Sequence, residues 1–130
     1  MFEGKVILIV DDDPTLLEMY VERIRAEGAV VLQAIDGEEA VNQAKENHPS
    51  LIMLDIMMPK LNGLEVLGQL KADLNTWEIP VIILSALNDE EKKKAGLALG
   101  AVDYIVKSDT LPSDVIAKIK AILFPESAQA

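Results

Sequence analysis

Short, nearly continuous apolar segments alternate along the chain with longer segments in which apolar residues recur every three or four positions. Five of the apolar segments are rich in β-branched residues, which is typical of strands covered on both faces of a sheet. We predict these strands over residues 6–10, 30–34, 51–54, 81–84 and 102–106.

The segments between the predicted strands have the periodicity of amphipathic helices. One apolar stripe consists of Leu17, Tyr20, Val21 and Ile24, and another consists of Val115, Ile116, Ile119, Ile122 and Leu123. Asp36 with Glu39 has the spacing of a capping box at a helix start, and Asn88 with Glu91 repeats that spacing. Residues that stop helices follow three of these segments: Gly28, Pro49 and Gly100.

Strand and helix therefore alternate five times, which predicts an α/β fold of the (βα)5 type. Because crossover connections between parallel strands are right-handed, we expect a doubly wound, five-stranded parallel sheet with helices on both faces. We assign residues 1–124 to a single domain, and residues 125–130 to a C-terminal tail or the stub of a linker.

The composition narrows the classes of function. The 130 residues include no cysteine and one histidine, His48, which excludes a disulfide, a thiolate nucleophile or a multi-histidine metal site within the chain. The formal net charge of −10 argues against direct nucleic-acid binding, because it repels phosphate backbones. No apolar segment approaches the ~20 residues of a membrane helix, and the N-terminus lacks the pattern of a signal peptide. We therefore expect a cytoplasmic protein that does not contact a membrane.

Polar residues follow four of the five predicted strands, at the edge where ligands bind in open parallel sheets. In chain order these residues are Asp11, Asp12, Asp13, Asp55, Ser85 and Lys107. Crowded carboxylates need positive charge between them, and Mg²⁺, or Mn²⁺ in its place, prefers such oxygen ligands. A carboxylate beside a metal, an ammonium group and a hydroxyl has the parts needed to accept a phosphoryl group.

Each residue of this predicted site also has a simpler interpretation when it is taken alone. Asp13 precedes Pro14, which favours the first position of a helix, so we assign Asp13 as an N-cap. This leaves Asp11 and Asp12 for the metal, although a turn followed by an acidic helix start would also explain that pair. A cap or turn would explain Asp55. The arrival of all these residues at successive strand ends favours a shared site.

The same residues, with their neighbours, carry a resemblance to a known family. The segments concerned are residues 7–12, 54–59, 62–63, 85–86 and 104–107. In this order they make the chain similar, over essentially its whole length, to the receiver domains of two-component response regulators, the CheY-like superfamily. The resemblance implies a flavodoxin-like sheet with the strand order 2-1-3-4-5.

The resemblance also implies a phosphoryl-transfer site with a bound metal ion. Asp55 would attack the phosphorus of a phosphohistidine on a partner protein and become an acyl phosphate. Asp12 and Asp55 would bind Mg²⁺ directly, together with the main-chain carbonyl of Met57, whereas Asp11 would act mainly through water. Such a domain assists its own phosphorylation and dephosphorylation but is not an enzyme in the ordinary sense.

A switch and a set of partners follow from the same resemblance. Ser85 would hydrogen-bond the phosphoryl group, and Lys107 would pair with its oxygens. Tyr104 is similar to the aromatic switch that turns inward as Ser85 moves toward the phosphate, which would remodel the surface of helix 4, strand 5 and helix 5. The implied partners are a sensor histidine kinase or phosphotransfer protein, a downstream protein or fused output domain, and a second copy of the chain bound through that surface.

Several positions depart from the family pattern. Ser108 follows Lys107 where receivers usually have a proline, often in a cis bond, and Asn62 stands where aspartate is common. Met57 and Leu87 flank the predicted site and are apolar. We hypothesise that these two residues restrict the approach of water to the phosphoryl group and slow its hydrolysis.

Two alternative functions remain open at this point. The segment 11–15 also satisfies the Asp-x-Asp-x-Thr pattern of haloacid-dehalogenase-type phosphohydrolases, with Asp11 as nucleophile and Asp13 as acid–base. That assignment leaves Asp55 without a role, and Pro14 ties Asp13 to capping. The other alternative is an adaptor with the receiver fold that binds its partners without phosphorylation.

Overall fold

The computed structural model describes residues 2–57, 62–86 and 88–125 of the chain. The described strands form one parallel sheet in the order β2-β1-β3-β4-β5. The strands are β1 (Val6–Val10), β2 (Val30–Ala34), β3 (Leu51–Leu54), β4 (Val81–Ser85) and β5 (Asp103–Val106). The helices are α1 (Pro14–Ala26), α2 (Gly37–Asn47), α3 (Gly63–Ala72), α4 (Glu90–Ala98) and α5 (Pro112–Leu123), with a 3-10 turn η1 (Lys107–Asp109) after β5.

This architecture confirms the predicted (βα)5 fold and the expected strand order. The first three strands have the predicted bounds, β4 is one residue longer, and β5 begins at Asp103 rather than Val102. Val102 donates its main-chain N–H to Val81 at 2.9 Å, but its side chain is exposed and lies before the paired residues of β5. None of the helices in the described part of the chain is long and apolar enough to span a membrane.

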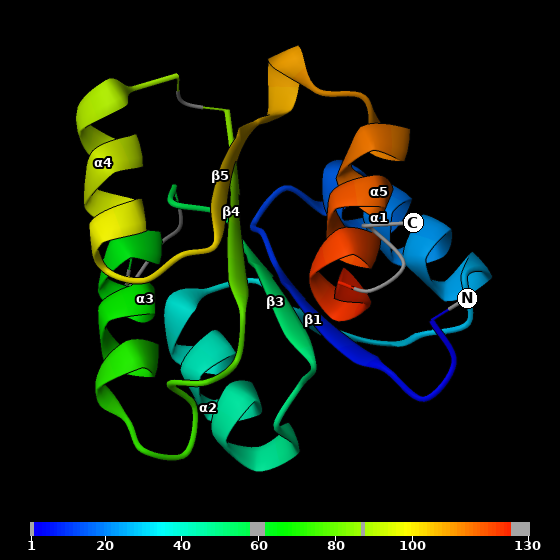
Figure 1. The fold of residues 1–130 in the computed structure, drawn as a ribbon, viewed down its shortest axis with the longest axis horizontal. Coiled ribbons are helices and arrows are strands. Elements are labelled where there is room, and N and C mark those ends of the chain that lie inside the picture. Colours follow the sequence, from blue (N-terminus) through cyan, green and yellow to red (C-terminus); the bar gives the residue numbers. More distant parts are fainter. Residues whose placement is uncertain (1, 58–61, 87, 126–130) are drawn as a thin grey trace.

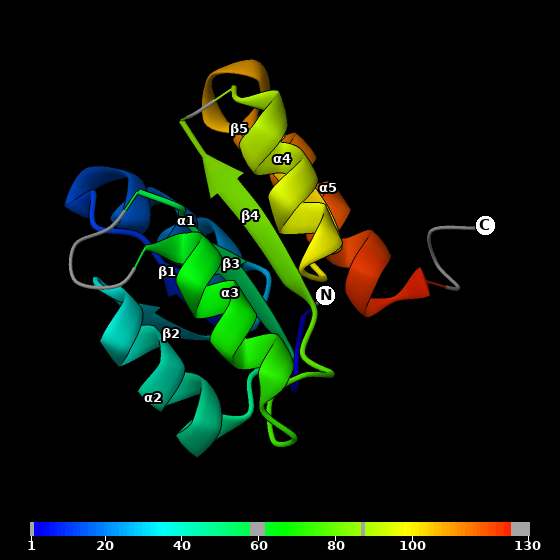
Figure 2. The same ribbon diagram turned by 90° about the vertical axis from the view of Figure 1, so that its left-hand side faces the viewer.

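The helices cover both faces of the sheet. Figure 1 shows α2, α3 and α4 on one side and α1 and α5 on the other, and the turned view in Figure 2 shows α3 and α4 packed along β3 and β4. Successive residues of a strand point to opposite faces. Leu8 and Val10 of β1 therefore lie in the core under α2, α3 and α4, whereas Ile7 and Ile9 lie in the core under α1 and α5. Two buried faces explain why the inner strands β1, β3 and β4 are apolar without alternation, whereas the edge strand β2 has exposed residues.

The helix starts confirm two of the predicted caps and correct a third. The Asp13 carboxylate accepts hydrogen bonds from the first turn of α1, and Asp36 accepts one from Glu39 N at 2.9 Å. The prediction that Asn88 caps α4 was wrong, because Asp89 does so instead, with its Oδ1 atom 2.9 Å from Glu91 N. Since α4 begins at Glu90, the capping side chain has to belong to the residue directly before it.

The helix ends agree with the predicted stop residues. Gly28 and Gly100 have φ angles of 101° and 114°, which residues with a Cβ atom rarely adopt. Helix α2 ends differently, because His48 itself adopts the left-handed conformation, with φ at 45°, directly before Pro49. His48 is exposed.

Candidate functional site

The site lies at the carboxyl edge of the sheet, where β1 delivers Asp11, β3 delivers Asp55 and β5 delivers Lys107. Val10 and Leu54 are direct partners in the β1–β3 pairing, so the two aspartates that follow them are neighbours. The main chain holds this register beyond the strands, because Asp55 N donates to Val10 O at 3.0 Å. The parallel register, and not any feature of the local sequence, therefore brings these carboxylates together.

Lys107 lies between the two buried carboxylates. Its Nζ atom is 2.7 Å from Asp11 Oδ2 and 3.4 Å from Asp55 Oδ2. The second oxygen of each carboxylate is also bonded, since Asp11 Oδ1 accepts from Asp13 N at 2.9 Å and Asp55 Oδ1 accepts from Met57 N at 3.2 Å. Both carboxylates are thus fixed in orientation by the turns that follow their strands.

The single ammonium group of Lys107 does not neutralise the negative charge of the carboxylates at this site. Burial raises the pKa of Asp55 to about 6, and the charge of Asp11 adds to the rise, although Lys107 opposes it. Burial acts to lower the pKa of Lys107, but the hydrogen bond to Asp11 and the charge of Asp55 outweigh it and raise that pKa. Lys107 is therefore cationic at neutral pH, and Asp55 ionises at an energetic cost.

The carboxylates of the site fit a hard divalent cation. Asp11, Asp12 and Asp55 each offer one oxygen, and these atoms lie within 4.8 Å of one another. Asp12 is exposed whereas the other two are buried, so the cluster opens to solvent on one side. Oxygen ligands with room for water suit Mg²⁺ or Mn²⁺, and the raised pKa of Asp55 shows that more positive charge would stabilise its ionised form.

A hydroxyl and a tyrosine lie beside the carboxylates on the outer half of the sheet. Ser85 ends β4 and is fully buried, and it pairs in register with Val106, the residue before Lys107. The Tyr104 side chain is 5% exposed, so its ring lies inside the protein. Burial raises the pKa of Tyr104, and a side-chain hydrogen bond with Ser85 opposes that rise. The two residues assigned to the switch are therefore in contact.

The turn after β3 depends on a glycine whose role the sequence reasoning missed. A Cβ atom at residue 63 would overlap the main-chain oxygen of Asp55, and Gly63 N donates to Ile56 O at 2.8 Å. Only glycine lets the start of α3 approach Asp55 this closely. The preceding Asn62 caps α3 by accepting from Glu65 N at 3.0 Å, and its Nδ2 donates to Glu65 Oε1 at 2.6 Å, a hydrogen bond that an ionised aspartate could not donate. The adjacent Asn62-Gly63 pair was the available signal.

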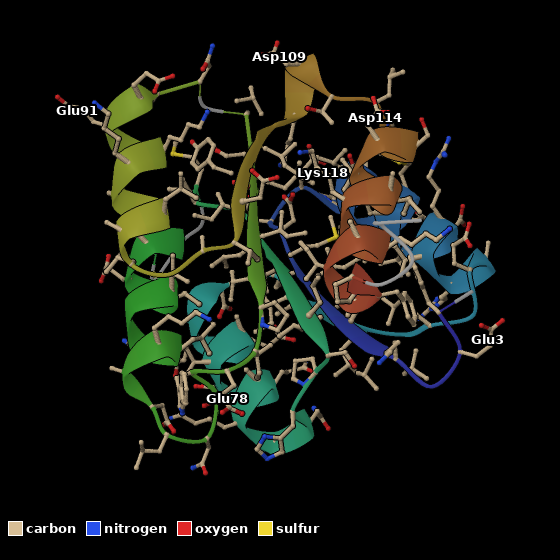
Figure 3. All side chains as sticks on the ribbon, viewed as in Figure 1. Glu3, Glu78, Glu91, Asp109, Asp114 and Lys118 are labelled. Atoms are coloured by element: carbon tan, nitrogen blue, oxygen red, sulfur yellow. The ribbon has the colours of Figure 1, made fainter. Side chains whose placement is uncertain are left out.

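The remaining predicted residues lie at the rim of the site or outside the described residues. Met57 is 56% exposed, directly after Asp55 and Ile56. Leu87 and the segment 58–59 lie outside the described residues. Ser108 lies in the 3-10 turn that follows β5, and the described part of the chain contains no cis peptide bond. Figure 3 shows Glu91 and Asp109 projecting outward at this same edge.

Comparison with known proteins gives consistent matches over most of the chain. A family model, the response regulator receiver domain, matches residues 7–120. The alkaline phosphatase synthesis transcriptional regulatory protein PhoP of Bacillus subtilis is 41% identical over 92% of this chain and 49% of its own length. The phosphate regulon transcriptional regulatory protein PhoB of Pseudomonas aeruginosa is 39% identical over 92% of this chain and 52% of its own length.

Solved structures agree with these matches. A putative response regulator from Chloroflexus aurantiacus superimposes with a TM-score of 0.86 at 33% identity, covering 93% of this chain and 98% of that one. The chain spans about half the length of the curated relatives it matches.

Proposed function

The chain belongs to the receiver domains of two-component response regulators, and from this premise we propose that Asp55 is the residue that accepts the phosphoryl group. The observation that carries the proposal is the position of Asp55. It is a buried carboxylate 3.4 Å from the Lys107 ammonium and is clustered with two further carboxylates that fit a metal ion. The high pKa of Asp55 matters little here, because a value of about 6 still leaves the carboxylate mostly ionised at neutral pH.

The proposed reaction is an in-line displacement at phosphorus. A carboxylate oxygen of Asp55 forms a bond to phosphorus while the bond to the imidazole nitrogen of a partner's phosphohistidine breaks, which leaves an acyl phosphate. A bound Mg²⁺ or Mn²⁺ would supply positive charge that stabilises the phosphoryl oxygens. Lys107, which follows β5 at the same edge of the sheet, pairs with those oxygens, and the buried hydroxyl of Ser85 donates a hydrogen bond to them.

For the metal we propose Asp12, Asp55 and the main-chain carbonyl of Met57 as direct ligands, with Asp11 acting mainly through water. The contacts of Asp11 support this division. Its Oδ2 atom is 2.7 Å from Lys107 Nζ, and its Oδ1 atom accepts a hydrogen bond from Asp13 N. Asp12 is exposed and has freedom to turn toward an ion.

The signal would leave the site through the Ser85–Tyr104 pair and reach the surface formed by α4, β5 and α5. That surface combines apolar and charged groups, as protein interfaces do. Leu97 and Val102 are 42% and 52% exposed, and Asp103 and Lys118 form an ion pair at 2.9 Å beside them. Lys118 is visible on α5 in Figure 3. We propose this surface for a second copy of the chain or a downstream partner.

The proposed partners are a sensor histidine kinase or a phosphotransfer protein upstream and an output protein or fused output domain downstream. The curated relatives are named as transcriptional regulators and are about twice as long as the chain, which supports a fused output. In that arrangement residues 1–124 are the receiver and residues 125–130 lead toward the output. The net charge of −10 argues only that this domain does not itself contact nucleic acid.

The hydrolase alternative is not favoured. It requires Asp13 as an acid–base, yet the Asp13 carboxylate accepts hydrogen bonds from Thr15 N and Leu16 N as the cap of α1. It also requires Asp11 as a nucleophile, yet Lys107 holds Asp11 more closely than Asp55, at 2.7 Å against 3.4 Å, and the buried Asp55 would have no role. The family match covers residues 7–120, which also favours the receiver.

The experiment that tests the proposed function is intact-mass spectrometry after incubation with acetyl phosphate, with and without Mg²⁺. We expect one added phosphoryl group on the wild type, dependent on the metal and absent from Asp55→Asn. Steady release of phosphate that survives in Asp55→Asn and is lost in Asp11→Asn would instead support the hydrolase. If the wild type gains no adduct and releases no phosphate, the phosphorylation-independent adaptor is the better description.

A further inference from the structure

Helix α4 buries little of its surface against the sheet. Of its nine residues only Gly96 is buried, and the first turn is built from charged residues. The neighbouring helix α3 has four buried residues, at positions 63, 66, 67 and 70. Figures 1 and 2 show α4 lying along β4 and β5 beside α3. The contact at Gly96 therefore decides how closely α4 approaches the sheet.

That contact has no room for a side chain. A Cβ atom at residue 96 would lie 2.5 Å from Cδ1 of Ile83 and 3.8 Å from a ring carbon, Cδ2, of Tyr104. Carbon atoms in contact are normally ~3.5–4.0 Å apart, so a methyl group here requires either Ile83 or α4 to move.

The packing around Ile83 and around α4 decides which of the two moves. Ile83 is fully buried and pairs in register with Leu54 on one side and Tyr104 on the other, so neighbours enclose it. Helix α4 has one buried residue to hold it. Added volume at residue 96 therefore displaces the helix, because the densely packed interior resists more strongly.

Moving α4 uncovers a residue of the site. The Tyr104 ring lies beneath Gly96, and its hydroxyl shares a hydrogen bond with Ser85 at the end of β4. Asp89, the N-cap of α4, is also close enough for its charge to raise the pKa of Tyr104. Tyr104 thus contacts α4 along the ring and Ser85 at its hydroxyl.

We propose that Gly96 is a positioning residue: by lacking a side chain it allows α4 to rest against Ile83 and Tyr104, and this contact holds the tyrosine beside Ser85. This contact is a property of the free protein, and its consequence for phosphorylation rests on the proposed function.

The chain offers a matched control for a test by Gly96→Ala. Gly68 lies within α3, and a Cβ atom there would meet nothing within 4 Å. Both substitutions replace a glycine inside a helix by the best helix former, so both gain the same intrinsic preference. We expect Gly68→Ala to raise the urea midpoint and Gly96→Ala to lower it. A rise in both would overturn the steric part of the proposal.

The position of Tyr104 can be followed by ¹⁹F NMR after incorporation of 3-fluorotyrosine. The chain contains two tyrosines, and Tyr20, a buried residue of α1, lies in the other core, where it serves as an internal reference. Gly96→Ala should shift and broaden the Tyr104 resonance and increase its response to a soluble paramagnetic agent, whereas Tyr20 and the Gly68→Ala spectrum stay unchanged. An unchanged Tyr104 resonance in Gly96→Ala would refute the proposal.

A second substitution separates the specific contact from general damage. Ile83→Val removes Cδ1, the atom that a Cβ at residue 96 would meet. The double variant Gly96→Ala with Ile83→Val should therefore return the Tyr104 resonance toward its wild-type position and raise the urea midpoint above that of Gly96→Ala. Simple addition of the two effects, without rescue, would show that the Ile83 contact does not position α4.

The rate of phosphorylation by acetyl phosphate tests the role of Gly96 in phosphorylation separately from the proposed function. We expect Gly96→Ala to acquire the phosphoryl group from acetyl phosphate several-fold more slowly than wild type, with recovery in the double variant. A wild-type rate in Gly96→Ala despite a shifted Tyr104 resonance would overturn the link to Ser85. If wild type itself gains no phosphoryl group, the proposed function fails, while the fluorine spectra still decide whether Gly96 positions Tyr104.

Discussion

Replacing Asp55 by asparagine should stabilise the metal-free protein at neutral pH. Asp55 is buried, and burial raises its pKa from 3.8 to about 6 in the folded state. The folded protein therefore binds a proton at Asp55 more tightly than the unfolded chain does. The ionised carboxylate costs folding free energy in full above pH 6, and the cost disappears as the pH falls below 3.8.

The size of the effect follows from the two pKa values. The difference between about 6 and 3.8 corresponds to about 3 kcal/mol above pH 6, at 1.36 kcal/mol for each pKa unit. The same two values leave about 1 kcal/mol at pH 4.5. Asparagine has nearly the same shape and no charge, so Asp55→Asn should recover most of this energy. The observed gain will be smaller than the full value, because Lys107 loses one of its two charged partners.

The assay is urea denaturation of both proteins in EDTA at pH 7.5 and pH 4.5. Other titrating groups are shared by the two proteins, so the change in their difference between the two pH values isolates Asp55. Asp12→Asn is the matched control, because it removes an exposed carboxylate of the same cluster and should change stability by about 0.5 kcal/mol or less. Added Mg²⁺ should stabilise wild type and narrow the gap to Asp55→Asn.

The reasoning fails if Asp55→Asn is no more stable than wild type at pH 7.5, or if its gain is the same at pH 4.5. A gain of equal size in Asp12→Asn would show that net charge, and not burial of Asp55, is responsible.

Three further predictions concern other residues of the chain. Lys107→Met leaves two buried carboxylates without their counter-charge, so it should lower the urea-derived stability at pH 7.5 by about 3 kcal/mol or more, and Mg²⁺ should restore part of the loss. His48 adopts a left-handed conformation at the end of α2, which is strained for a residue with a Cβ atom. His48→Gly should therefore raise the free energy of unfolding by about 1 kcal/mol, and an unchanged urea midpoint would contradict this. Met57→Asn and Leu87→Glu replace apolar residues with polar ones that can hydrogen-bond water near the phosphoryl group. Both variants should therefore lose the phosphoryl group faster than wild type, which intact-mass spectrometry over time would measure.

The sequence by itself determined the elements and the edge of the sheet where the chemistry would lie. Continuous β-branched segments specify strands that are buried on both faces, and Asp13 before Pro14 specifies the start of α1, because these features depend only on local conformation and burial. Parallel strands end at one edge of the sheet. The residues that directly follow the first, third and fifth strands could therefore be predicted to lie close together, and they are Asp11, Asp55 and Lys107. The wrong prediction at Asn88 has a local cause. Asn88 and Asp89 are both good capping residues, and the position of the first helical residue, Glu90, makes Asp89 the cap.

Only the tertiary structure decided how these residues meet. The closer partner of Lys107 is Asp11 and not Asp55, because the geometry of the turns after β1 and β3 orients each carboxylate. The Asn62-Gly63 pair indicates a turn, but the sequence does not show that Gly63 has to lie against the main chain of Asp55 or that Gly96 has to lie against Ile83. In both cases the crowding atom belongs to another element of the structure. Such distances depend on how helices pack against the sheet, and packing sums many weak contacts from the whole chain.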